Sequence, residues 1–204
     1  MDDGRGISKS RVEALTDGIY AIAMTLLVLS IGVPSLPPGA SAEAVLPGLV
    51  AGLWEGVLAC AIAFLVLVSF WLGHERVFQQ VARVDRTFVN LNLVTLLGIV
   101  FVPFSAAITS DYPGVRISIW IFALNLGAIG LLNGLQWLYL VRHPALLRTP
   151  IAPPDARRGL ARSLCSPAVA LLAVLISFPS PGLSAYAYML LPVLLAVTDH
   201  MWSR

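Results

Sequence analysis

The stretch RVEALTDGIYAIAMTLLVLSIGV, residues 11–33, joins a charged segment to a long, mostly apolar run. About 20 such residues are needed for a helix to cross the hydrocarbon core of a bilayer. Within the run, Ile22, Leu26 and Leu29 recur at i, i+4 and i+7, so they share one helix face, with Thr25 beside them. A small hydroxyl among branched apolar side chains is a pattern from which a hydrophobically gated ion pore can be built.

The composition agrees with a membrane protein. Of the 204 residues, 58% are hydrophobic and 12% charged, and the mean hydropathy is +0.85. Soluble domains carry about 25% charged residues. A net charge of +2 is too small to indicate nucleic-acid binding. Cys60 and Cys165 both lie in apolar stretches, which favours buried free thiols over a disulfide. No Cys/His spacing indicates a metal site, and we expect no cofactor.

Six apolar segments qualify as membrane spans in a single all-α domain covering residues 1–204. Their approximate ranges are 12–33, 45–73, 87–108, 117–141, 163–178 and 183–198. Proline lacks the amide donor, so Pro34, Pro37 and Pro38 end the first helix. Pro113-Gly114 predicts a tight turn between the third and fourth spans.

The basic residues predict the orientation of these spans. Six crossings place 12 of the 13 lysines and arginines on one side of the membrane and leave Arg116 alone on the other. The positive-inside rule then places both termini in the cytoplasm. A cleaved signal peptide is a second interpretation of the N-terminus, but Glu13 and Asp17 do not suit a basic leading segment.

Polar side chains in or near the spans are candidates for structure or function. A carboxylate in hydrocarbon costs about 3 kcal/mol, so it normally pairs. Asp17 lies about 140° around the helix from Ile22 and does not share its face. We expect Asp17 to accept a hydrogen bond from Arg11, His74 or an asparagine amide. Glu55 is either a cation attractor at an outer vestibule or a snorkelling side chain, and the sequence does not decide between them.

The Ile22, Leu26 and Leu29 stripe also has a second interpretation, because such stripes on membrane helices commonly face lipid or simply pack. Two features favour a pore. The same helix carries small residues that permit close helix contacts, and its polar cluster is concentrated at the predicted cytoplasmic mouth.

The motif Arg11-x-x-x-Leu15-Thr16-Asp17-Gly18 resembles the Arg-x-x-x-Phe-Ser-Asp-Gly signature that opens the first helix of the transmembrane protein 175 family. These are potassium channels of endosomes and lysosomes, with prokaryotic relatives. The chain departs from the signature at Leu15, which keeps only bulk, and at Thr16, which keeps the hydroxyl. The likeness covers about the first 110 residues and continues through Ala21–Leu29, Phe70-Trp71-x-x-His74, Asp85-Arg86, Asn92-Leu93 and Pro103-Phe104.

The resemblance implies a homotetramer in a bacterial plasma membrane, with four first helices lining a pore for potassium and no small-molecule substrate. Ile22 would form the narrow constriction, Leu26 and Leu29 further rings, and Thr25 the hydroxyl ring behind potassium preference. A hydrogen-bond network would hold the helices together, formed by Arg11, Thr16, Asp17, Trp71, His74 and Asn92. No Thr-Val-Gly-Tyr-Gly carbonyl filter occurs, so we expect modest selectivity.

Two other classes are weighed against a channel. A secondary transporter or proton-coupled carrier needs broken helices and a midplane carboxylate, for which Glu55 is a candidate. An enzyme needs a nucleophile with its base, or a set of metal ligands, and the sequence provides neither spacing.

Overall fold

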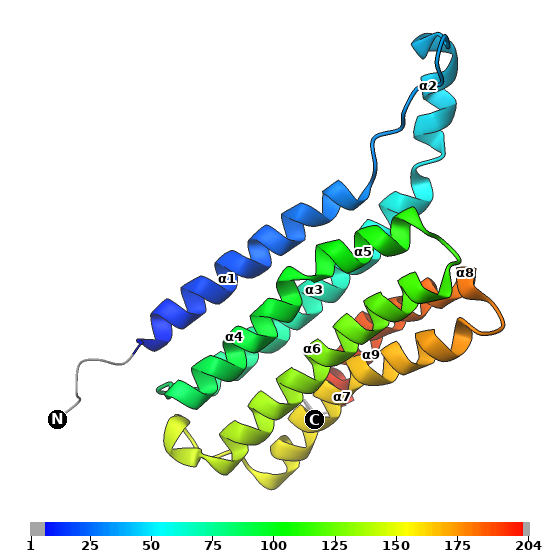
Figure 1. Ribbon diagram of the computed structural model, residues 1–204. Coiled ribbons are helices and arrows are strands. Elements are labelled where there is room, and N and C mark those ends of the chain that lie inside the picture. Colours follow the sequence, from blue (N-terminus) through cyan, green and yellow to red (C-terminus); the bar gives the residue numbers. More distant parts are fainter. Residues whose placement is uncertain (1–6, 202–204) are drawn as a thin grey trace.

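The computed structural model describes residues 7–201, except for the side chains of residues 185, 196 and 199–201. It is an all-helical bundle of long, tilted helices (Figure 1). Within that part of the chain, five helical segments are long and apolar enough to cross a membrane. They are Lys9–Ser30 (α1, Lys9–Leu26, with the 3₁₀ turn η1, Leu27–Ser30), α3 (Trp54–Gln80), α4 with α5 (Arg86–Val100 and Val102–Asp111), α6 (Arg116–Arg142) and α7 (Pro153–Ile176).

The remaining helices are shorter. α2 (Ala42–Ala51) lies between the first two long segments. After α7 come α8 (Pro181–Ser184), the 3₁₀ helix η3 (Ala185–Met189) and α9 (Leu190–Met201). This last group covers the predicted sixth span, 183–198, as three short pieces rather than one long helix. A 3₁₀ turn, η2 (Pro144–Leu146), lies in the loop between α6 and α7.

The predicted second span, 45–73, differs from the structure at its start. The chain breaks at Gly52 and Leu53, so α2 is separate from α3, and α2 projects away from the bundle with no buried residue (Figure 1). The apolar composition continues across the break, and hydropathy alone therefore does not reveal it. α3 in turn runs seven residues beyond the predicted end, to Gln80.

Two other predicted ranges also differ. The third span is interrupted at Phe101. Pro103 explains this, because it has no amide to donate to Ile99 and its ring crowds that carbonyl. The fifth begins at Pro153 rather than 163. Its first turns hold Arg157, Arg158 and Arg162, and these charges lowered the hydropathy so that the predicted helix was too short. Pro153 and Pro154 occupy the first positions of the helix, where proline is tolerated.

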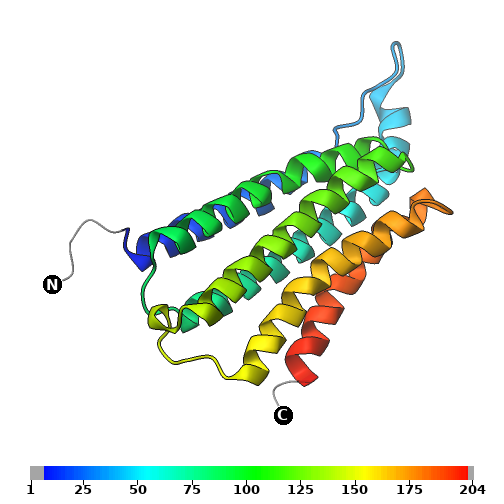
Figure 2. The same ribbon diagram turned by 60° about the horizontal axis from the view of Figure 1, so that its bottom comes forward.

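The long helices run alternately up and down. α1, α4 and α7 begin at the end of the bundle where α3, α6 and α9 finish, as Figures 1 and 2 show. We call this the basic end, because Arg83, Arg86, Arg142 and Arg148 lie in or beside its loops. At the opposite end, Pro113 and Gly114 form a turn in which Gly114 has φ +77° and the Val115 amide donates to the Tyr112 carbonyl at 3.3 Å. A proline followed by a positive-φ glycine is the sequence of a type II turn.

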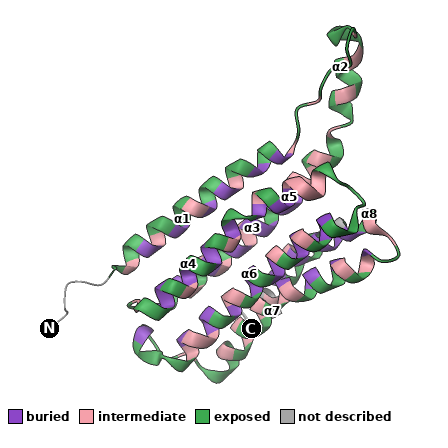
Figure 3. Cartoon of the chain, viewed as in Figure 1, coloured by how far each residue is buried: buried purple, intermediate pink, exposed green. Residues whose placement is uncertain are grey.

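α6 lies inside the bundle and α1 lies at its edge. Of the α6 membrane span, 44% is buried within the chain, against 28% of the span that contains α1. Glycines allow α7 to approach α6 closely. A Cβ at Gly130 would lie 2.8 Å from Ser166 Cβ, and one at Gly159 would fall within the Trp137 ring. The edge position leaves one side of α1 without a partner in the single chain (Figure 3).

Candidate functional site

The two faces of α1 have different surroundings. Val12, Thr16, Tyr20 and Ala23 follow a helical spacing and are buried against the bundle. On the other side, Ile22 is 60%, Leu26 42% and Leu29 73% exposed. An exposed apolar face on a membrane helix meets lipid or another protein chain. The sequence pattern therefore separates a packed face from a face that is free within one chain.

Thr25 belongs to the exposed face. Its hydroxyl donates to the Ile22 carbonyl at 2.8 Å. This bond uses the hydroxyl hydrogen and fixes the rotamer, and it leaves the oxygen lone pairs available to the outside of the bundle.

The exposed stripe persists although α1 ends before Leu29. The helix finishes at Leu26, and Leu27–Ser30 form a 3₁₀ turn. Residues three apart are eclipsed in a 3₁₀ helix, so Leu29 stays in line with Leu26. The Ser30 hydroxyl donates to the Leu27 carbonyl at 2.6 Å, within the same turn.

Three buried side chains link α1, α4 and α3 at the level of the polar motif. The Asn92 amide donates to the Thr16 hydroxyl at 3.0 Å, and His74 Nε2 lies 3.1 Å from Asn92 Oδ1. Because that oxygen only accepts, Nε2 carries the hydrogen. The His74 ring also stacks on Phe78, with centroids 4.1 Å apart. Thr16 and Asn92 have no exposed surface.

Asp17, the next residue along α1, points to a different helix. Its Oδ1 accepts a hydrogen bond from Trp71 Nε1 of α3 at 2.9 Å. Neighbouring helix residues differ by about 100°. Thr16 therefore bonds to α4 while Asp17 bonds to α3, and α1 is fixed to both. The expected donors for Asp17 were Arg11, His74 or an asparagine amide, and in the structure the donor is the Trp71 indole.

Arg11 does not join these contacts. Its side chain is exposed near the start of α1, and the structure gives its guanidinium no hydrogen bond or ion pair within residues 7–201. The structure thus brings together five of the six predicted network residues: Thr16, Asp17, Trp71, His74 and Asn92.

Further polar contacts hold α4 and α6 together. Asp85 caps α4 by accepting from the Phe88 amide at 2.8 Å, and its other oxygen accepts from the Tyr139 hydroxyl at 2.5 Å. Deeper in the bundle, Gln136 donates to Thr95 at 2.6 Å. These two pairs were not predicted from the sequence. Polar residues within apolar spans do indicate that hydrogen bonds between helices exist, but not which residues pair.

Known proteins share both this sequence and this fold. A profile described as "Endosomal/lysosomal potassium channel TMEM175" matches residues 11–103, the part that contains α1, α3 and α4. A protein named as a potassium channel from Streptomyces collinus is 34% identical over 152 residues, which are 72% of this chain and 71% of that protein. The chain belongs to the TMEM175 family. The resemblance seen in the first 110 residues is therefore confirmed.

The likeness to the family extends over nearly the whole chain. A protein from Chamaesiphon minutus named as a potassium channel is 32% identical over 196 residues, covering 93% of this chain and 94% of that one. A crystal structure described as a lysosomal potassium-selective channel TMEM175 homolog from the same organism matches with a TM-score of 0.77 at 30% identity. It covers 93% of this chain and 96% of its own. This TMEM175-family chain is a multi-pass membrane protein and not an enzyme.

Proposed function

We propose that this protein is a potassium-permeable cation channel of the bacterial plasma membrane, with the exposed face of α1 as its pore lining. The observation that carries the proposal is the division of α1 into a packed face and an unpartnered stripe of Ile22, Thr25, Leu26 and Leu29. Relatives named as potassium channels support the choice of permeant ion.

A pore requires several copies of the chain, because one α1 at the edge of a bundle encloses nothing. In the proposed homotetramer, four α1 helices surround a central axis and bury the stripe that is exposed here. The small residues Gly18 and Ala21 are also exposed on α1, and small side chains permit close helix contacts. The Thr16 and Asp17 bonds would then hold each pore helix on its own bundle.

The proposed channel has six crossings, with α8–α9 as the sixth and both termini in the cytoplasm. The basic end carries arginines from every loop on that side, including Arg83, Arg148 and Arg157, whereas Arg116 lies at the opposite end. This asymmetry supports a cytoplasmic basic end by the positive-inside rule.

Conduction would be limited by a ring of Ile22 side chains. A narrow apolar ring opposes ion passage because water leaves it, and no moving lid is needed. Thr25, one turn farther along, would provide oxygen ligands at the next level. Selectivity that depends on side-chain hydroxyls and pore width, without fixed backbone carbonyls, is expected to be modest.

A secondary transporter or proton-coupled carrier is the alternative. Glu55 was its candidate midplane carboxylate, but Glu55 lies in the first turn of α3, at the end of the bundle opposite the basic end. A carboxylate at that depth suits an outer vestibule or a snorkelling position better than a midplane binding site.

Purified protein in planar bilayers tests the proposal. With potassium on one side and sodium on the other, a channel gives step-like currents, with a reversal potential that indicates a potassium preference. Cross-linking should yield a tetramer. Saturable flux that follows the gradient of a coupled ion would favour the carrier, and a monomer that conducts normally would contradict the pore assignment.

A further inference from the structure

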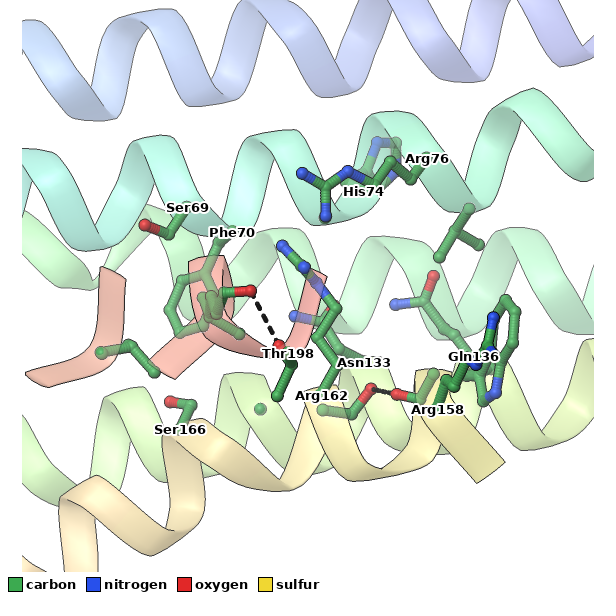
Figure 4. Close-up of a pocket in the computed structure, with 18 of the residues that line it drawn as sticks. Ser69, Phe70, His74, Arg76, Asn133, Gln136, Arg158, Arg162, Ser166 and Thr198 are labelled. Atoms are coloured by element: carbon green, nitrogen blue, oxygen red, sulfur yellow. Dashed lines mark hydrogen bonds between the residues drawn. The ribbon is translucent and has the colours of Figure 1, made fainter. Parts of the chain in front are cut away.

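A cavity separate from the α1 face lies inside each bundle at the basic end. It has a volume of about 270 Å³, is partly open to the outside and is lined by residues of α3, α6, α7 and α9 (Figure 4). Small-molecule sites begin near this size, at about 300 Å³. The cavity suits a single polar group. It does not include the exposed stripe of α1, so the proposed conduction path does not explain it.

The charged side chains of the cavity are mainly positive. Arg76 of α3 and Arg158 and Arg162 of α7 line it, with Asp155 as the one carboxylate among its described lining residues. Asp155 is already bound to Arg158, whose Nη1 lies 2.8 Å from Oδ1. Among the lining residues that the structure describes, positive charges thus outnumber negative charges by two.

The arginines converge from different helices. Figure 4 shows Arg76 and Arg162 extending into the space between α3 and α7. A Cβ at Gly73 would lie 3.8 Å from Arg162 Nε, so Arg162 crosses from α7 to the surface of α3.

Neutral donors complete the lining. Asn133 of α6 is partly buried, and the structure gives its amide no hydrogen bond within residues 7–201. By contrast, the hydroxyls of Ser163 and Ser166 donate to the Gly159 and Leu126 carbonyls. Asn133 therefore brings two N–H donors to the cavity, and arginine forks beside amide donors suit the oxygens of a phosphate.

The position along the bundle also suits a lipid. Arg76 is four residues from the end of α3, and Arg158 and Arg162 lie in the first ten residues of α7. Basic pockets between membrane helices on the cytoplasmic side are the kind of site that holds phospholipid headgroups. The deeper lining is apolar, with Phe70, Leu191 and Leu195.

We propose that this cavity binds a phosphate group, with Arg76, Arg158, Arg162 and Asn133 as its ligands. Two sources share this chemistry: the headgroup of an anionic phospholipid in the inner leaflet, and free phosphate from the cytoplasm. The site is independent of conduction, so its test does not depend on the proposed channel activity.

Binding to the purified full-length protein tests the proposal. Dioctanoyl phosphatidylglycerol, dioctanoyl phosphatidylcholine and inorganic phosphate are titrated separately and followed by microscale thermophoresis. We expect phosphatidylglycerol to bind about tenfold more tightly than the zwitterionic lipid, because the choline cation of phosphatidylcholine is repelled by the same arginines that attract the phosphate. Saturable binding of phosphatidylglycerol alone assigns a lipid, and binding of inorganic phosphate as well assigns the phosphate group itself.

The variants locate the site. Arg162→Gln should weaken binding about tenfold. Arg157→Gln removes the same charge from an exposed neighbour that does not line the cavity, and it should leave affinity within about twofold. If Arg162→Gln does not fold, Arg162→Lys and Asn133→Asp replace it, with the lysine variant binding and the aspartate variant not. Equal losses for Arg157→Gln and Arg162→Gln, or no preference for phosphatidylglycerol and no phosphate binding, would overturn the proposal.

Discussion

The Asn92 side chain of α4 donates a hydrogen bond to the Thr16 hydroxyl of α1 at 3.0 Å, and neither side chain is exposed. The two residues are 76 positions apart in sequence. Asn92 also accepts from His74, so its amide satisfies partners on two helices. A buried amide with its donor and acceptor both used fixes the position of α1 more specifically than apolar contacts do.

Thr16→Val should destabilise the fold, because it keeps the shape of the side chain and leaves the buried Asn92 amide without an acceptor. We expect a loss of about 1–2 kcal/mol in the free energy of unfolding. Denaturant unfolding in detergent measures it. Thr16→Ser is the matched control, since it retains the hydroxyl, and a valine variant as stable as the serine variant would contradict the role of this bond.

The bond between Asp17 and Trp71 is expected to support assembly more than permeation. Asp17→Asn weakens a charge-assisted bond, and Trp71→Phe removes its donor, each at a cost of about 1 kcal/mol. Both variants should shift the protein from tetramer toward smaller species in size-exclusion chromatography. Channels that do assemble should keep the potassium preference of the unaltered protein. Normal assembly with a changed reversal potential would instead place Asp17 in the ion path.

Ile22→Ala should widen the proposed constriction and make it easier to wet. We expect a several-fold rise in single-channel current and weaker discrimination between cations. Planar-bilayer recording measures both. Leu171→Ala is the control, because Leu171 is equally exposed, at 60%, but belongs to α7 on the other side of the bundle. Equal effects from the two substitutions would rule out Ile22 as the narrowest point.

Thr25→Val should lower the preference for potassium over sodium, because the variant keeps the branched shape and removes the oxygen. A neutral hydrogen-bonding contact contributes about 0.5–1 kcal/mol, so the permeability ratio should fall about two- to fivefold. The bi-ionic reversal potential reports the ratio directly. Thr25→Ser should retain it, and an unchanged potential in the valine variant would remove Thr25 from the selectivity mechanism.

The sequence predicted much of the geometry of α1 because helical spacing alone separates its faces. Asp17 lies away from Ile22 by rotation, and the structure indeed directs Asp17 to α3 while Ile22 is exposed. The sequence did not identify the hydrogen-bond donor to Asp17. Trp71 is 54 residues away, and whether its indole reaches Asp17 depends on how α1 packs against α3. The pairs Tyr139–Asp85 and Gln136–Thr95 were missed for the same reason.

Hydropathy also misplaced two helix starts. Hydropathy is averaged over several residues, so the break at Gly52 did not lower it enough to be seen, and α2 and α3 were predicted as one span. It also excluded the arginine-rich first turns of α7, where Arg158 and Arg162 lie on a helix whose other face packs against α6. Those turns line one side of the basic cavity, and no spacing in the sequence relates them to Arg76 of α3.

The packing of α6 on α7 should depend on Gly130. A Cβ there would lie 2.6 Å from Pro167 Cδ and 3.1 Å from the Ser163 carbonyl oxygen, so Gly130→Ala must push the helices apart. Overpacking costs about 1–3 kcal/mol, which exceeds the gain of up to about 1 kcal/mol from alanine's helix propensity. Gly48→Ala in α2 is the matched control, because nothing lies within 4 Å of its Cβ. We expect a lower melting temperature for the Gly130 variant alone. Equal or higher stability in that variant would mean that the two helices can separate without cost.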